Sequence, residues 1–327
     1  CLMSLIVDDG FAGAGGWDLA ARALGMEARG IERMPEARAT RAAAGLITLH
    51  DDVWTHIPDG RADGRVDSPP CQTFSSAGTG SGRRALEDVL HGIRTRRYTD
   101  IDVLREWGEA LGDERTAAVL TPLHFATQYD YTWIAWEQVP PVLPVWEACA
   151  DELSRLGWYT WTGILSAEQY GVPQTRRRAL LIASKLHPVH RPHPTHARYV
   201  KRGSRRDEGL PRWASIGDVL DWPVGSFMLT HFSAHITRQL WEPSLTLTHT
   251  PDYQMPGHAT ISVADAGQLQ GFPSDYPWRG TLTMQRLQVG NAIPVGLAEA
   301  ALHEAAALDF RARKPHAHGC PHVHMST

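Results

Sequence analysis

The N-terminal segment orders an apolar run, a glycine-rich turn and a helical stretch, and this order restricts the possible folds more than any other part of the chain. The apolar run is Leu5-Ile6-Val7, the turn covers residues 9–16, and the helical stretch covers residues 17–24. A second short strand, residues 28–32, follows and ends in Glu32. Strand and helix continue to alternate along the chain. We therefore expect an α/β fold with a mostly parallel sheet, helices on both faces, and a ligand at the carboxyl ends of the strands.

The glycine turn favours a ligand that contains adenosine and carries no pyrophosphate. Gly13 and Gly15 match the first two glycines of the G-x-G-x-x-G dinucleotide fingerprint, but Asp18 stands where the third is required. Asp9 and Asp18 would also repel a pyrophosphate, whereas Glu32 is suited to the two hydroxyls of a ribose. S-adenosylmethionine is such a ligand. The alternative is an ordinary strand-to-helix turn that binds nothing.

Composition indicates a chain with a sizeable core in a reducing compartment. The 327 residues are 43% hydrophobic, enough for one large domain or two unequal ones. The four cysteines are widely scattered, with no CxxC pair. No apolar run is long enough to span a membrane. The apolar start has no basic lead and runs into Asp8-Asp9, so we expect no signal peptide and a cytoplasmic protein.

Basic residues are gathered in three places despite a net charge of −4. The clusters contain Arg83, Arg84, Arg94, Arg96 and Arg97; Arg176, Arg177 and Arg178; and Lys201, Arg202, Arg205 and Arg206. A phosphate backbone responds to local patches and not to the total charge, so these clusters are candidate nucleic-acid contacts. Solvated loops are the alternative interpretation.

Pro69-Pro70-Cys71-Gln72 predicts a rigid loop that presents a thiol. Proline fixes φ and removes a backbone donor, which excludes the middle of a helix and a central strand. A thiol presented among polar neighbours is typical of a nucleophile. A small buried cysteine in a turn is the alternative, because free cysteine is commonly buried.

Taken together and in order, the motifs of this chain resemble those of the DNA (cytosine-5-)-methyltransferase family along nearly its whole length. The matching segments are residues 9–16, Glu32, Asp51-Asp52-Val53, residues 68–75, Asp113-Glu114-Arg115 with Leu120 and Pro122, residues 134–139, residues 170–178, residues 269–273 and residues 290–294. Each segment alone is a weak signal. Their common order is what makes the resemblance specific.

The resemblance implies a Rossmann-like methyltransferase fold, a cofactor and a set of site residues. S-adenosyl-L-methionine would be held by Phe11, Gly13, Gly15, Gly16, Glu32, Asp52, Val53, Pro70 and Asn291. The catalytic residues would be Cys71, Glu137, Arg176 and Arg178, and the substrate-binding residues Gln72, Ser75 and Gln174. No metal site is expected.

The implied chemistry explains why those residue types are needed. C5 of cytosine is a poor nucleophile. Addition of the Cys71 thiolate at C6 would make C5 nucleophilic. A protonated Glu137 would act as the acid at N3, and burial behind Trp136 and Val139 would favour that form. Arg178 would hold O2 of the base, and Arg176 would lie near the phosphate. The alternative for Glu137 is a surface acid at the end of a strand.

Several positions depart from the family pattern. Gly10 replaces the usual leucine of the first motif, and Gln138 replaces the asparagine beside the catalytic glutamate. Ala118 lies where a leucine often lines the cofactor site. The stretch 78–113 is longer than expected, and glycines at 78, 80 and 82 would let the loop 75–82 close over a flipped base. These departures affect fine geometry and not the reaction class.

The resemblance also predicts the domain organisation. Residues 1–185 and 243–312 would form the catalytic domain, residues 186–242 a target-recognition region, and residues 313–327 a His-rich tail. Trp213, Ile216, Val219, Leu220 and Trp222 would form a small core in the recognition region, with a disordered insertion as the alternative. A helix over residues 294–310 would pack beside the first motif. The tail carries possible zinc ligands, but adventitious or no metal binding is favoured there.

The implied partner is duplex DNA. The protein would be monomeric, bacterial or phage-encoded, and a cognate restriction endonuclease could accompany it. Two alternatives are an RNA cytosine-5 methyltransferase of the same family and a catalytically idle DNA-binding relative. The intact Cys71, Glu137 and Gln174-x-Arg176-x-Arg178 favour an active enzyme over an idle one.

Overall fold

The structure is a computed structural model of the whole chain. It describes residues 4–70, 80–201, 209–223, 227–230, 237–248, 253–254 and 261–307, with only the backbone for a few of them. The predicted nucleophile Cys71 with Gln72 and Ser75, most of the third basic cluster, and the His-rich tail lie outside the described residues.

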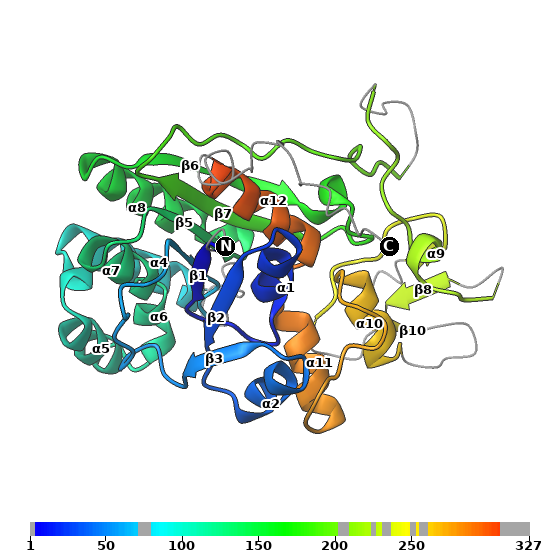
Figure 1. Cartoon of the computed structure of the whole chain (residues 1–327), viewed down its shortest axis with the longest axis horizontal. Helices are drawn as coiled ribbons and strands as arrows, with labels where there is room; N and C mark the ends of the chain where they lie inside the picture. Colours follow the sequence, from blue (N-terminus) through cyan, green and yellow to red (C-terminus); the bar gives the residue numbers. More distant parts are fainter. Residues whose placement is uncertain are drawn as a thin grey trace, which may run out of the picture.

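A seven-stranded sheet forms the centre of the molecule (Figure 1). Its order is β3-β2-β1-β4-β5-β7-β6, and β7 runs antiparallel to both of its neighbours while the other strands are parallel. The strands are β1 (Ile6–Asp9), β2 (Glu27–Ile31), β3 (Ile47–His50), β4 (Gly64–Asp67), β5 (Trp133–Gln138), β6 (Tyr159–Ser166) and β7 (Arg177–Ser184). The predicted mostly parallel sheet is confirmed.

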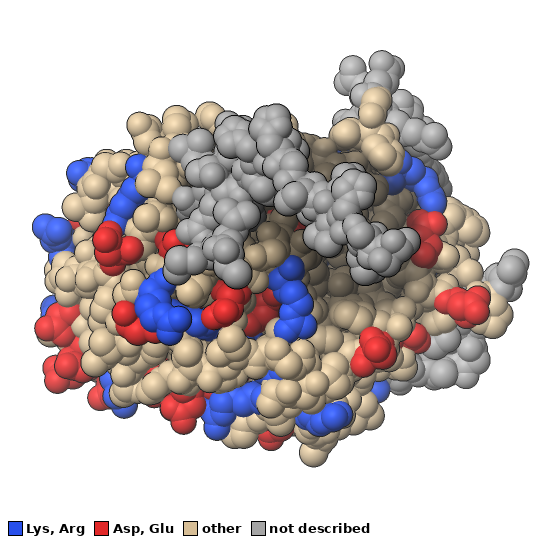
Figure 2. Space-filling view, viewed as in Figure 1, with Lys and Arg blue, Asp and Glu red and all other residues tan. Residues whose placement is uncertain are grey.

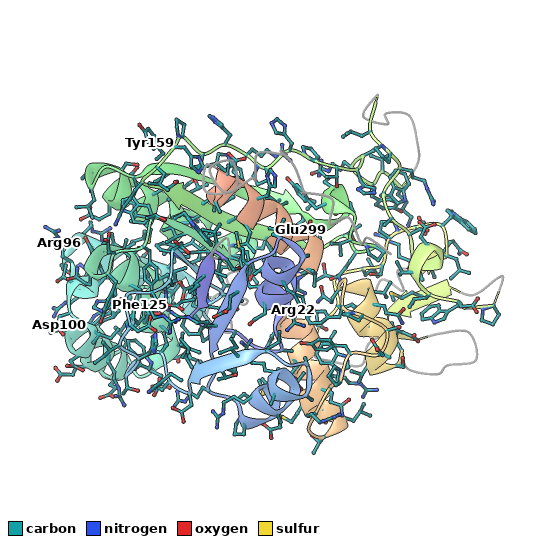
Figure 3. All side chains as sticks on the ribbon, in the orientation of Figure 1. Arg22, Arg96, Asp100, Phe125, Tyr159 and Glu299 are labelled. Carbon is teal, nitrogen blue, oxygen red and sulfur yellow. The ribbon has the colours of Figure 1, made fainter. Side chains whose placement is uncertain are left out.

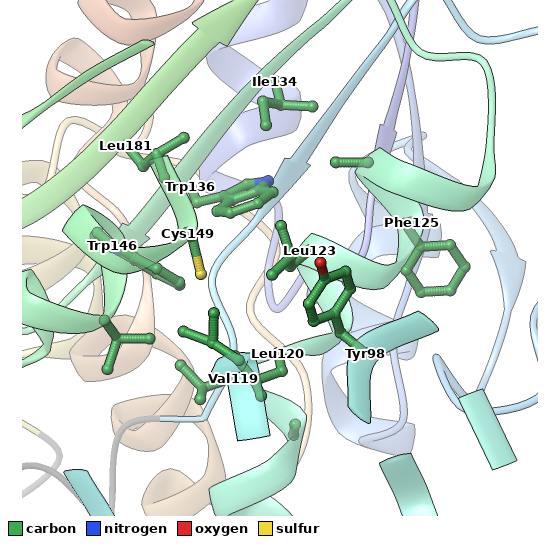
Figure 4. Packing of buried hydrophobic residues seen from close by; sticks show 14 of the residues in the cluster. Tyr98, Val119, Leu120, Leu123, Phe125, Ile134, Trp136, Trp146, Cys149 and Leu181 are labelled. Atoms are coloured by element: carbon green, nitrogen blue, oxygen red, sulfur yellow. The ribbon is translucent and has the colours of Figure 1, made fainter. Parts of the chain in front are cut away.

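Helices cover both faces of the sheet, and β5 shows why, because its side chains are apolar on both sides. In β5, Trp133 and Ala135 pack toward α1 (Gly16–Ala23) and α12 (Val295–Ala305), since alternate side chains of a strand point to opposite faces. Ile134 and Trp136 pack toward α8 (Leu143–Arg155) on the other face (Figure 4). The expected packing of α12 beside α1 is confirmed, and Figure 3 shows Arg22 of α1 and Glu299 of α12 on these adjacent helices.

The long stretch after the nucleophile loop is helical. It contains α4 (Gly80–Arg94), the short η1 (Arg97–Thr99), α5 (Ile101–Ala110), α6 (Glu114–Ala118) and α7 (Thr121–Gln128). The carboxylate of Asp100 starts α5 by accepting hydrogen bonds from the backbone N–H groups of Asp102 and Val103. Arg96 and Asp100 lie at the left end of the molecule in Figure 3, on the side of α5. Arg96 faces Glu152 there, with 3.8 Å between Nε and Oε1.

A second, smaller unit contains a three-stranded sheet in the order β10-β8-β9. Its elements are α9 (Ile216–Val219), β8 (Phe227–Thr230), β9 (Thr237–Gln239) and β10 (Tyr253–Gln254), and α10 (Val263–Leu269) and α11 (Leu282–Asn291) follow. This small sheet therefore extends past the predicted boundary at residue 242.

Three of the five residues predicted to form the core of the smaller unit are found in it. Ile216, Leu220 and Trp222 are buried in one cluster with residues of α10 and α11. Val219 is instead exposed, and Trp213 packs edge-on against Tyr199 outside that cluster. Within the described part of the chain, every helix is too short or too polar to cross a membrane.

Candidate active site

A cavity of about 280 Å³ opens at the carboxyl ends of the central strands. It lies where β1 and β4 are neighbours although the chain passes through β2 and β3 between them, and such a reversal of strand order is where open α/β sheets bind ligands. Gly13, Glu32, Asp52 and Asn291, far apart in the sequence, all line it. Phe11, Gly16, Val53 and Pro70 also line the cavity, whereas Gly15 does not.

Glycine is required in the turn for two different reasons. Gly13 and Gly15 have φ values of 52° and 105°, a region that side chains disfavour. Gly16 has an ordinary conformation, but a Cβ there would lie 2.6 Å from the carbonyl oxygen of Ile293. The start of α1 is thus pressed against the connection between α11 and α12, which places the first and last predicted motifs on one cavity wall.

The predicted ribose-binding acid is held by the turn itself. The two carboxylate oxygens of Glu32 accept hydrogen bonds from the backbone N–H groups of Gly13 at 2.6 Å and Met34 at 2.7 Å. Burial raises the pKa of Glu32, and these two hydrogen bonds oppose that effect. Each oxygen retains a second lone pair, so Glu32 can accept from hydroxyl groups as well.

Asp9 and Asp18, which were predicted to face a bound phosphate, do not line the cavity. Asp18 instead forms a two-pronged ion pair with Arg41 at 2.7 and 2.8 Å, and both side chains are fully buried. The positive charge of Arg41 therefore neutralises Asp18, and the repulsion that we expected between Asp18 and a pyrophosphate is not present. The failure of the dinucleotide fingerprint at Asp18 has a structural cause, namely a buried partner on α2 (Pro35–Ala43).

Glu137 and Arg178 meet at the other end of the cavity. Arg178 Nε lies 2.6 Å from Glu137 Oε1, both side chains are largely buried, and both residues line the cavity. Glu137 is the penultimate residue of β5 and Arg178 is the second residue of the antiparallel β7, so the sheet itself brings the acid and the guanidinium together. The alternative of a surface acid at Glu137 is wrong, because this residue is only 5% exposed.

Two side chains hold the segment that leads into Cys71. Gln138 donates from Nε2 to the carbonyl oxygen of Pro69 at 2.5 Å, and Trp17 donates from Nε1 to Ser68 Oγ at 3.0 Å. Gln138 Oε1 also accepts from the backbone N–H of Val139. The glutamine that departs from the family pattern thus joins the end of β5 to the prolines of the loop.

Gln174 and Arg176 are buried in the connection between the two parts of the chain. Arg176 donates to the carbonyl oxygens of Leu247 at 2.9 Å and Gly290 at 2.8 Å, and it also lines the cavity. Gln174 accepts from the backbone N–H of Leu247 and donates to the carbonyl oxygen of Leu269, away from the cavity. Both therefore tie the start of β7 to Leu247, and Arg176 also ties it to α11 while Gln174 ties it to α10.

Comparison of the sequence with known proteins finds related enzymes. Residues 238–306 match the sequence model of the C-5 cytosine-specific DNA methylases. The type II methyltransferase M1.HphI of Haemophilus parahaemolyticus is 25% identical over 91% of this chain and 86% of its own length. The type II methyltransferase M.MthTI of Methanothermobacter thermautotrophicus is 25% identical over 75% of this chain and 78% of its own. The family model and these relatives together support a C5 cytosine methyltransferase. The chain is an enzyme of the DNA (cytosine-5-)-methyltransferase class.

Solved structures show the same fold for this methylase. The crystal structure of the S. pombe Dnmt2 methyltransferase superposes with a TM-score of 0.63 at 17% identity, covering 94% of this chain and 99% of the other. A putative DNA modification methyltransferase from an E. coli prophage gives 0.59 at 16% identity, covering 94% and 100%. The predicted Rossmann-like methyltransferase fold is confirmed.

The methylase cavity also contains residues that sequence reasoning did not assign. Met34 and Trp54 line it, and so do Arg33 and Glu114, which are joined by an ion pair at 2.7 Å. Ala118, which we had placed where a leucine often lines the cofactor site, also lines it. Glu114 lies in a segment that we had matched to the family without giving it a role. Arg33 directly follows the ribose-binding acid, and that adjacency is the sequence signal that could have identified it.

Proposed function

We propose that this enzyme transfers a methyl group from S-adenosyl-L-methionine to C5 of a cytosine flipped out of duplex DNA, through a covalent bond between Cys71 and C6. The observation that carries the proposal is the meeting of Glu137 and Arg178 in the same cavity as Glu32 and Pro70. An acid and a permanently charged guanidinium lie beside the segment that continues into the cysteine. That is the set of groups needed to bind and activate a cytosine ring.

The cavity residues fit the proposed cofactor. Glu32 offers carboxylate oxygens for ribose hydroxyls, and Asp52 and Val53 line the neighbouring wall, where the adenine would lie. The backbone N–H groups of Gly13 and Met34 both donate to Glu32, so they do not offer hydrogen bonds to a phosphate group. This suits a ligand without phosphate. S-adenosyl-L-methionine bound there would supply an electrophilic methyl group next to the loop of Pro69 and Pro70.

The protein side chains would prepare cytosine for that transfer. The Cys71 thiolate would bond to C6, which makes the former C5=C6 electron pair available at C5. Glu137 would deliver a proton to N3 as negative charge develops on the ring, and Arg178 would stabilise O2. Methyl transfer would leave S-adenosyl-L-homocysteine as the second product. Loss of the C5 proton to solvent and cleavage of the sulfur–C6 bond would then free the thiolate, and return of the N3 proton to Glu137 would restore neutral 5-methylcytosine. Flipping the base out costs a few kcal/mol of stacking and pairing.

Duplex DNA is the acceptor that the relatives support. The curated relatives carry the name type II methyltransferase, so we propose that this chain methylates a specific site and is paired with a cognate restriction endonuclease. The smaller unit with α9 and β8 to β10 would read that site. On the face in Figure 2, basic and acidic side chains are interspersed, so the proposed DNA contact is a local patch and not the whole face.

The test measures tritiated methyl transfer to duplex DNA, to RNA and in the absence of an acceptor. We expect transfer to DNA alone, and Cys71→Ser should abolish it because a hydroxyl does not form the reactive anion at neutral pH. Transfer to RNA alone would contradict the proposed substrate. DNA containing 5-fluorocytosine at the target should form a covalent adduct that requires both Cys71 and the cofactor, because fluorine cannot leave as a cation.

Cys149 provides the matched control for the thiol. It lies on α8, fully buried beside Trp136 and Trp146 (Figure 4), and burial raises the pKa of its thiol far above the ordinary range. Cys149→Ala should therefore retain the adduct. If Cys149→Ala lost the adduct and Cys71→Ser kept it, the nucleophile would be Cys149 and not Cys71.

A further inference from the structure

Gly10 lies where a side chain would collide with two neighbouring side chains, although its φ is not in the left-handed region. It follows β1 and donates its N–H to the carbonyl oxygen of Val66 in β4 at 2.9 Å. A Cβ at this position would lie 1.8 Å from Asp67 Oδ1 and 2.2 Å from Arg65 Nη2. The space that a side chain at position 10 would fill is occupied by two side chains from β4.

Those two side chains form a buried ion pair. Arg65 donates from Nε to Asp67 Oδ2 at 2.9 Å and from Nη2 to Oδ1 at 2.8 Å, and both side chains are fully buried. The guanidinium also lies 3.8 Å from the centre of the Phe125 ring. Burial raises the pKa of Asp67 to about 6 against the attraction of Arg65, so the pair is ionised at neutral pH.

The pair lies between the two segments that must be aligned for methyl transfer. Asp67 is followed directly by Ser68, Pro69 and Pro70, which line the cavity on the side that continues into Cys71. Gly10 is followed by Phe11 and the glycine turn, which line the proposed cofactor side. Buried ion pairs seldom stabilise a fold more than apolar side chains of the same volume, so a role in fixing geometry is the better explanation for this one.

We propose that Arg65 and Asp67 are positioning residues that fix the nucleophile loop against the cofactor turn by filling the space left at Gly10. The inference rests on the proposed function, because the loop and the turn matter as carriers of the nucleophile and the methyl donor. A small relative displacement of two reacting groups lowers the rate of the chemical step far more than it lowers the affinity for either ligand. The pair therefore acts on turnover and not on cofactor binding.

The first arm of the test compares two isosteric substitutions. Asp67→Asn keeps the shape of the side chain and removes its charge. Asp8→Asn does the same to a second buried ion pair of the sheet, in which Asp8 Oδ1 lies 2.7 Å from Arg29 Nη2. Asp67→Asn should lower kcat for methyl transfer roughly 10- to 100-fold while the Kd for S-adenosyl-L-methionine changes less than about threefold. Asp8→Asn should lower Tm comparably and leave kcat per folded enzyme within about twofold.

The second arm needs no activity. Gly10→Ala should lower Tm in the wild-type background, because its Cβ has no space beside Asp67 and Arg65. In the Arg65→Leu/Asp67→Ala background the same substitution should lower Tm little, since the clashing atoms are gone. This arm keeps the packing claim testable even if Asp67→Asn fails to fold.

The outcomes separate the inference from the proposed function. A wild-type enzyme that transfers no methyl group to any acceptor refutes the proposed function. An active wild type in which Asp67→Asn and Asp8→Asn reduce kcat equally refutes the positioning role, and so does an Asp67→Asn variant with normal kcat. An equal Tm loss from Gly10→Ala in both backgrounds refutes the packing on which the role depends.

Discussion

Replacing Glu137 by glutamine separates the acid at this site from its place in the structure. Glu137 Oε1 lies 2.6 Å from Arg178 Nε, and the residue is 5% exposed. A glutamine has the same shape and can still accept one hydrogen bond from Arg178 through its amide oxygen. It carries no charge and cannot deliver a proton to N3 of cytosine. The substitution therefore removes the proposed chemistry and leaves most of the packing.

The two consequences differ in size. Loss of a general acid lowers turnover by roughly 10²- to 10⁴-fold. The structural cost is smaller, about 1–3 kcal/mol, because a hydrogen bond to a charged partner is weakened while the partner stays hydrogen-bonded. The variant should thus remain folded, bind duplex DNA within about threefold of wild type, and lose at least about a hundredfold in rate.

The assay is single-turnover methyl transfer with cofactor and DNA in excess, combined with urea unfolding and DNA binding measured by fluorescence anisotropy. Glu147→Gln is the matched control, because Glu147 is exposed on α8 and should tolerate the same change with no loss of rate. A Glu137→Gln enzyme that retains more than a tenth of the wild-type rate would falsify the assignment of Glu137 as the acid at N3.

Three further substitutions test other parts of the site. Gly16→Ala should weaken S-adenosyl-L-methionine binding at least about tenfold in calorimetry, since its Cβ would meet the Ile293 carbonyl oxygen at 2.6 Å; unchanged affinity would contradict the close approach of α1 to that segment. Gln138→Ala should lower kcat roughly tenfold with little change in cofactor affinity, because about 1.4 kcal/mol from the hydrogen bond to Pro69 is lost; a change confined to affinity would argue against a role in the loop. Burial, and to a lesser extent the nearby charge of Arg65, lowers the pKa of His56 to about 4. In the unfolded chain this histidine binds a proton below about pH 6.5, whereas in the folded protein it stays neutral until about pH 4. The free energy of unfolding from urea curves should therefore fall by at most about 3 kcal/mol between pH 7 and pH 4 from this group, and His56→Phe should remove that part of the decline.

The sequence predicted the features that depend on local pattern. The apolar strand before Asp9, the positive-φ glycines and the all-buried β5 each follow from residue type and spacing. The convergence of Gly13, Glu32, Asp52 and Asn291 followed from the rule that parallel strands end at one edge. Motif order supplied the candidate roles of Glu137 and Arg178, but the ion pair between them is seen only in the structure.

The charged groups inside the sheet could not be predicted from the sequence. Arg65 and Asp67 alternate with apolar residues in a strand of four, and such a pattern is normally a sign of a solvated face. Arg41 was assigned no role because its partner, Asp18, lies on a different helix. Partners brought together only by tertiary packing leave no periodic signal, so a buried ion pair looks the same in sequence as two surface charges.

The two buried ion pairs near the cofactor turn, Arg41–Asp18 and Arg65–Asp67, each bring opposite charges together. Arg41 pairs with Asp18, and Arg65 pairs with Asp67, and the buried Asp9 lies close enough to feel the charges of both pairs. Burial and the neighbouring Asp18 raise the pKa of Asp9 well above its usual range, against the pull of Arg41. Two guanidinium groups thus pair with two carboxylates. Removing any one charged partner would leave a net charge directly under the turn, and this is why single substitutions in either pair should cost more than replacement of the whole pair.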